Sequence, residues 1–165
     1  MTYALIRDEI KTTLEGVAGI GEVHDYRRHS TTWKEIFDRH KNTATGKLLN
    51  WEITKQDEVL TLEAVGNAVS TEPFYRRTHG ISILGVQALD EPGGPVDTSG
   101  ETPSEKEFQD LVESVVVALR QNNFLGATTL LQILPQVPII GHDMFGGVLC
   151  HICQIVFGAI ERVGG

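Results

Sequence analysis

Cysteine is scarce in this sequence, which holds only Cys150 and Cys153 among 165 residues. On an extended segment, side chains three positions apart point to opposite faces, which excludes a disulfide between these two thiols. A zinc site that adds His151 and His142 is disfavoured for the same reason, because its ligands would be divided between two faces. The pattern is typical of two reduced, buried thiols in a cytoplasmic protein.

Long apolar runs and excess positive charge are also lacking. No stretch reaches the roughly 18 apolar residues of a membrane-spanning helix, and charges at Arg7, Asp8 and Glu9 leave no room for a signal peptide. The formal net charge of -8 argues against general affinity for nucleic acid or anionic membranes. A composition of 41% hydrophobic and 22% charged residues excludes wholesale disorder, and the length fits one domain spanning 1–165.

No catalytic motif stands out. The glycine-rich segment 16–21 follows an expected helix and precedes an expected strand, the reverse of the order in dinucleotide-binding folds. We interpret it as a turn that ends a helix. No Gly-x-Ser-x-Gly elbow is present either. We therefore predict no enzymatic activity, no cofactor and no metal ion.

One cluster of histidines and acids could still form an acid–base or metal site. It consists of His24, His29, His40, Asp25, Glu35 and Asp38. The same pattern is typical of a solvated surface, which is the interpretation we prefer.

Two segments have the apolar spacing of amphipathic helices. In residues 2–16 the apolar positions recur every three to four residues, and Thr2 can cap the start. In residues 104–121 the spacing is clearer, Ser104 and Glu107 form a capping box, and Asn122 can stop the helix. A third, short helix is predicted over residues 32–41.

The remaining periodicity predicts strands. Alternation over Leu49–Thr54 indicates a half-buried strand, residues 55–58 a turn, and residues 59–65 its hairpin partner. Gly80 and Gly85 suggest bulges or bends within a longer strand. The other expected strands cover 22–28, 74–89, 128–134, 137–140 and 148–162, with Pro135 between two of them. Because helices do not alternate with strands, we predict an α+β fold, in which both main helices pack on one face of a mostly antiparallel sheet.

Residues 90–103 break every pattern. Three prolines, three glycines and four acids, Asp90, Glu91, Asp97 and Glu101, predict a long, mobile acidic loop.

Charge is divided unevenly along the chain. Residues 22–47 carry six basic side chains, including Arg27 and Arg28, against four acidic ones, and Arg76 and Arg77 form a second basic pair. Residues 90–113 carry eight acids against Lys106 alone. Such a division suits head-to-tail association, in which the basic surface of one copy meets the acidic region of the next, and it equally suits charges that only solvate loops.

As an ordered series of patterns, the chain resembles the tail terminator (tail-completion) proteins of long-tailed bacteriophages. The patterns are the opening helix, the strand Leu49–Thr54, the run from Arg76 to Asp90 before the acidic segment, the helix start at Ser104–Glu113, and the closing strand around Val148–Ile155.

The resemblance implies a structural role. Such proteins have an α+β fold and form a ring, usually of six copies, on the growing end of the tail tube. The ring stops polymerisation and presents a surface to the head–tail connector. The implied partners are other copies of the chain, the tube protein and the connector protein. The implied location is the virion tail, reached from the host cytoplasm, and DNA would pass through the ring without sequence-specific contact.

Two other functions stay open at this point. A head-completion or connector (neck) protein would share the ring but contact the portal and DNA. A small metal- or ligand-binding enzyme would use the cluster between His24 and His40.

Overall fold

The computed structural model of the chain describes residues 3–26, 48–63, 74–89, 103–122, 131–145 and 148–164. These ranges contain two helices and a five-stranded sheet. In chain order the elements are α1 (Tyr3–Glu15), β1 (Glu22–His24), β2 (Leu49–Glu63), β3 (Phe74–Ala88), α3 (Pro103–Gln121), β4 (Leu131–Phe145) and β5 (Val148–Gly164). The predicted helix over 32–41 and residues 90–102 of the predicted acidic loop lie outside this part of the chain.

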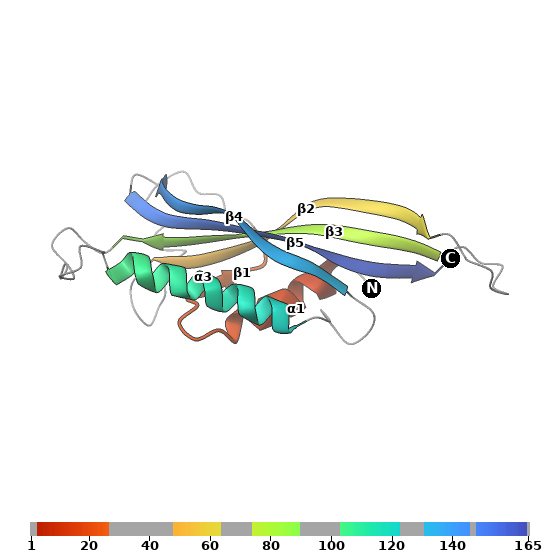
Figure 1. The fold of residues 1–165 in the computed structure, drawn as a ribbon, viewed down its shortest axis with the longest axis horizontal. Helices are drawn as coiled ribbons and strands as arrows, with labels where there is room; N and C mark the ends of the chain where they lie inside the picture. The colour runs from red at the N-terminus through yellow and green to blue at the C-terminus, as the bar shows by residue number, and fades with distance from the viewer. Residues whose placement is uncertain are drawn as a thin grey trace.

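The sheet has the strand order β1-β2-β3-β5-β4, with β1 parallel to β2 and every other pair antiparallel. Strand β3 is central: it pairs with β2 from Phe74 to Gln87 and with β5 from Phe74 to Ala88. The sheet twists so strongly that β2 and β4 exchange top and bottom from one end to the other (Figure 1). The predicted α+β fold with a mostly antiparallel sheet is confirmed.

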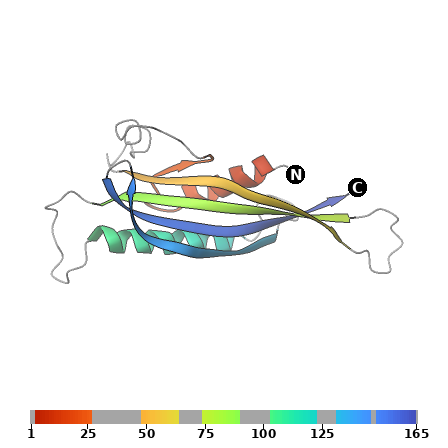
Figure 2. The same cartoon turned by 90° about the horizontal axis from the view of Figure 1, so that it is seen from above.

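Both helices lie on one side of the sheet, as predicted (Figures 1 and 2). Their apolar stripes and the facing strand residues share one core. Fully buried members are Ile6, Ile10 and Leu14 of α1, Val115 and Leu119 of α3, and Trp51, Ile53, Ile83 and Ile155 of the strands. Burial of an apolar side chain of this size stabilises the fold by about 1.5–3 kcal/mol, so this layer fixes the helices on the sheet.

The turn after α1 ends the helix, as its glycines predict. Gly19 and Gly21 adopt φ values of 75° and 79°, which residues with a Cβ rarely adopt. Trp51 Nε1 donates a buried hydrogen bond of 2.8 Å to the carbonyl oxygen of Ile20. This bond ties the turn to β2 and sets the position of β1.

The predicted turn at residues 55–58 is wrong, because β2 continues without a break to Glu63. A register shift between Lys55 and Asp57 takes the place of the turn. Asp57 pairs with Gly80, where a Cβ would lie 1.7 Å from Asp57 Oδ1, so the absence of a side chain at Gly80 makes room for the irregularity. The predicted hairpin within this segment is accordingly a single strand.

Strand β4 likewise replaces two predicted short strands. It runs from Leu131 to Phe145 past Pro135, with register shifts between Ile133 and Gln136 and between Gln136 and Ile139. Proline is tolerated there because β4 is an edge strand, whose outer side forms no ladder within the sheet. Residues 128–130 of the predicted strand lie outside the described ranges.

Helix α3 begins at Pro103, so Ser104 lies inside its first turn and the predicted capping box is wrong. Pro103 takes its first position, where the missing N–H leaves no hydrogen bond unmade. Ser104, predicted as the cap, is buried, and its Oγ lies 3.2 Å from Nε2 of His151 on β5. The hydroxyl thus helps to anchor the start of the helix on the sheet.

The predicted bulge or bend at Gly85 is absent, because the register of β3 is regular there. Gly85 instead allows the side chains of Trp51 and Cys153 to pack closely against the backbone of β3. A Cβ at Gly85 would lie 2.6 Å from Trp51 Cζ3 and 2.8 Å from Cys153 Sγ, whereas one at Gly141 would meet nothing within 4 Å.

We expect Gly85→Ala to lower the free energy of unfolding by about 1–3 kcal/mol, because the buried indole cannot move aside without strain. Gly141→Ala, also in a strand, is the control and should be neutral or slightly stabilising. Urea unfolding measures both. Equal stability of the two variants would contradict the packing described around Trp51.

Candidate functional site

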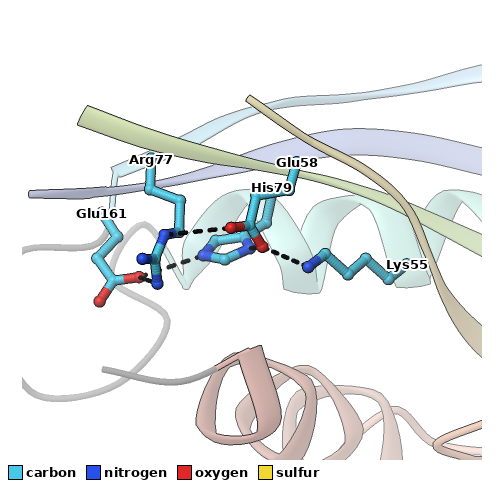
Figure 3. A network of polar contacts seen from close by, with 5 residues as sticks. All are labelled: Lys55, Glu58, Arg77, His79 and Glu161. Atoms are coloured by element: carbon cyan, nitrogen blue, oxygen red, sulfur yellow. Dashed lines mark hydrogen bonds and ion pairs between the residues drawn. The ribbon is translucent and has the colours of Figure 1, made fainter. Parts of the chain in front are cut away.

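The most concentrated group of charged side chains lies on the helix side of the sheet, near the start of β3. Figure 3 shows its five members, Lys55, Glu58, Arg77, His79 and Glu161. Register pairs Glu58 with His79 and Arg77 with Glu161, and side chains two apart on a strand share a face. Three strands therefore bring these charges together, and we call them the charged cluster.

His79 is the centre of the charged cluster and is 1% exposed. Its Nε2 lies 3.2 Å from Glu161 Oε2, and its Nδ1 lies 3.5 Å from Glu58 Oε2. The Tyr3 ring covers it at a centroid distance of 6.1 Å. The imidazole is within hydrogen-bond distance of Glu161, which helps to fix its orientation, whereas Nδ1 makes only the longer contact with Glu58 and no hydrogen bond within the described residues. Through these contacts the cluster joins β2, β3, β5 and α1.

Lys55 and Arg77 balance the two carboxylates. Arg77 Nε lies 3.3 Å from Glu58 Oε1 and Arg77 Nη1 3.9 Å from Glu161 Oε2, while Lys55 contacts Glu58 and lies over the Tyr3 ring. These positive neighbours lower the pKa of Glu58, first through the hydrogen bond from Lys55. Burial alone would raise the pKa of Glu161, but hydrogen bonding, including that with His79, and nearby positive charge, including that of Arg77, hold it below its ordinary value.

The two arginines predicted as an interface pair are separated by the strand. Arg77 faces the helix side and is ion-paired within its own chain, whereas Arg76 is exposed on the opposite face. The six other predicted interface residues lie outside the described ranges: Arg27, Arg28, Asp90, Glu91, Asp97 and Glu101.

Sequence reasoning missed four of the five members of the charged cluster. The alternation of Arg77 and His79 along a strand was a usable signal. Glu58 was hidden by the turn predicted around it. Glu161, at the end of an apolar strand, gave no signal of burial.

The histidine cluster is described only in part, because His29 and His40 lie outside the described residues. His24 on β1 is buried and pairs in register with Glu52, and Asp25 lies 3.4 Å from Arg7. Within the described ranges, no group of three or more histidine, cysteine or carboxylate side chains is placed to hold a metal ion.

The two cysteines lie on opposite faces of β5, as predicted. Cys153 is buried in the core beneath the helices, whereas Cys150 packs with Leu48 and Val86 in a second apolar cluster. Burial raises the pKa of the Cys153 thiol to about 12. His151 shares the face of Cys153 and lies against Phe108 and His142, at ring-centroid distances of 5.6 and 4.7 Å.

Comparison with known proteins adds no family assignment. No protein-family model matches the chain, and no curated protein matches it either. In the part of the chain that the structure describes, neither helix is long and apolar enough to cross a membrane.

We expect Glu161→Gln to destabilise the protein at pH 7 by about 1.5–3 kcal/mol, the cost of removing a buried charged hydrogen-bond partner. The folded-state pKa of Glu161 is depressed, so its contribution is present above the unfolded pKa of about 4.3 and is lost as pH falls through the folded pKa. The variant should therefore lose less stability than the wild type between about pH 5 and 3. Unfolding curves across this range measure both effects, with the exposed Glu113→Gln as control. Parallel pH profiles for the wild type and Glu161→Gln would contradict the proposed pairing.

The buried thiol gives a second prediction. With its pKa raised to about 12, Cys153 stays protonated at neutral pH and is shielded from reagents. A chromogenic disulfide reagent should label it only when the protein unfolds. Rapid labelling of Cys153 in the native protein, located by peptide mass, would contradict its burial.

Proposed function

We propose that this chain is a tail terminator of a long-tailed bacteriophage, which forms a ring on the end of the tail tube, stops its polymerisation and presents the joining surface to the head connector. The observation that carries the proposal is the α+β fold, which is the fold class that the resemblance implies. In this domain helices α1 and α3 cover the same face of a mostly antiparallel sheet.

The dimensions of the sheet support a ring subunit. Strands β2, β3 and β4 each have 15 residues. At about 3.3 Å per residue such a strand spans roughly 50 Å, which is long for a domain of this size. An elongated, stiff sheet with helices on one face suits the wall of a short cylinder.

The positions of some charged side chains suggest that the two ends of the sheet bind different partners. Arg76 lies near the start of β3, whereas α3 begins beside His151, which pairs with Gln87 near the other end of β3. The exposed acids Glu107 and Asp110 lie in the first turns of α3. Eleven residue steps along the strand separate Arg76 from Gln87, roughly 35 Å, so Arg76 lies far from the exposed acids at the start of α3.

This geometry favours a different use of the charges from the contact between neighbouring copies that the sequence predicts. Copies side by side at the same level would not bring Arg76 of one copy to the α3 acids of the next. The two charged ends suit contacts along the axis of a ring instead, with the tube at one end and the connector at the other.

The oligomeric mass of the purified chain tests the proposal. Light scattering at low and high salt, alone and with tail tube protein, should give a ring-sized assembly or a monomer that assembles when tube protein is added. Binding to portal protein and not to tube protein would favour the neck-protein alternative. A monomer that carries stoichiometric metal and ignores both partners would favour the enzyme alternative.

Charge reversal at the two arginines separates binding from folding. Arg76→Glu should leave the free energy of unfolding unchanged and weaken salt-sensitive binding to the tube or connector protein. Arg77→Glu should lower the stability, because it places a third carboxylate beside Glu58 and Glu161. Pull-down at several salt concentrations and urea unfolding measure the two effects. If Arg76→Glu instead splits the ring into monomers, the charges hold neighbouring copies together and the axial assignment is wrong.

A further inference from the structure

Within the described ranges, the sheet has two strand edges without a ladder partner, on opposite sides of the sheet. Strand β4 forms one of these edges along its whole length in that part of the chain. On the other side, β1 pairs only with residues 50–52 of β2, which leaves the rest of β2 unpaired in the described part of the chain. Unpaired edges are templates for strand addition by another chain.

Natural edge strands are usually protected by charges, prolines or bulges, and both edges carry such protection over part of their length. On β2 the exposed residues 55–58 include three charged side chains and a register shift. On β4 two register shifts follow Ile133, in a segment that holds Pro135 and Pro138.

Next to these features each edge exposes a pair of apolar side chains, of which Leu134 lies within the first register shift of β4. Val59 and Leu60 of β2 are 52% and 56% exposed, and Ile133 and Leu134 of β4 are 48% and 63% exposed. Consecutive strand residues point to opposite faces, so the edge of β2 is apolar on both faces at this position. Apolar side chains on an open edge favour association.

The two apolar pairs lie almost level across the sheet. The register can be followed straight across the sheet from β4 to β2: Ile133 pairs with Gly158 of β5, Gly158 with Gly80 of β3, and Gly80 with Asp57 of β2. Asp57 is two residues from Val59. Ile133 and Val59 also share a face, since Gly158 and Thr78, their partners in register, both lie on the face away from the helices. A stagger of two residues therefore brings the pairs opposite one another.

The strand directions are also compatible. Three successive antiparallel pairings make β2 and β4 run in opposite directions. A second copy in the same orientation thus presents its β2 antiparallel to β4 of the first, the pairing that closely spaced edges form most readily. Because the two edges differ, the contact is heterologous, and repeated contacts generate a ring when the rotation closes.

The second apolar stretch of β4, around Ile139 and Ile140, is a poorer partner. It lies level with Glu52 and Trp51 of β2, and β1 already occupies the edge of β2 there. The segments that can pair between copies are therefore the last part of β2, which contains Val59, and the first part of β4, which contains Ile133.

We infer that neighbouring copies join edge to edge, with the Val59–Leu60 segment of β2 in one copy forming an antiparallel pair with the Ile133–Leu134 segment of β4 in the next. This inference rests on the proposed function for the closed ring, and it adds which surfaces make the contact. It places the helices of all copies on one side of a continuous sheet.

Leu60→Asp tests the contact, because an aspartate there would be desolvated opposite an apolar side chain. We expect at least a tenfold weaker self-association, seen as a shift from ring to monomer mass at equal concentration. Leu5→Asp is the matched control, because Leu5 is 53% exposed and belongs to α1, not to either edge strand. Circular dichroism shows whether each variant is folded.

A double variant, Val59→Cys with Ile133→Cys, gives a readout that does not depend on destabilising the chain. The two positions lie three strand spacings apart within one copy, roughly 14 Å, too far for an internal disulfide. Oxidation should produce a ladder of covalent oligomers, which neither single variant forms.

The outcomes separate this inference from the proposed function. A wild-type ring whose mass survives Leu60→Asp, with no ladder from the double variant, overturns the edge contact and leaves the ring intact. A wild-type chain that stays monomeric with tube protein present overturns the ring and the edge contact together.

Discussion

Hydrogen bonding along both edges of β3 is the constraint on which the rest of the molecule depends. Because β3 pairs from Phe74 onward with β2 and β5, those strands inherit its length and its two-faced alternation. The face that carries Ile81, Ile83 and Gly85 receives both helices, and the indole of Trp51 fills the space that Gly85 leaves. A shift of the strand pairing by one position would exchange the buried and exposed faces of the shifted strand.

The same face changes character along its length. Beneath the helices it is apolar, and near the start of β3 it holds Arg77, His79 and Glu161, with Glu58 from the neighbouring strand. A buried polar cluster contributes less net stability than apolar packing, but it fixes orientation because each group needs its partner. The cluster thus connects the end of the sheet to Tyr3 at the start of α1.

The fold class was predictable because its signals are local. The apolar stripe of α3 and the alternation from Leu49 to Thr54 each arise within one element, and the helix and the strand are both confirmed. The strand is not half-buried as predicted, because Asn50 and Glu52 are buried as well as Trp51 and Ile53. The predictions that failed depend on neighbours: Lys55–Glu58 has the composition of a turn, yet pairing with β3 holds it extended, and Pro135 is tolerated only because β4 lies at an edge.

The candidate site was less predictable for a related reason. Arg76 and Arg77 are adjacent in sequence, but the pleat sends one to solvent and the other into the charged cluster, so their charges serve different purposes. The partners of Arg77 lie in strands distant in sequence, and no local pattern joins them.

In the proposed ring, the long twisted sheet forms the wall, charged groups near the two ends of the sheet meet the axial partners, and the strand edges of neighbouring copies form the lateral contact. Electron microscopy of the purified wild-type chain tests this most directly, with tube protein added if the chain alone is monomeric. The account predicts closed rings of uniform diameter with cyclic symmetry, free or on tube ends. Dispersed single domains under both conditions would contradict it.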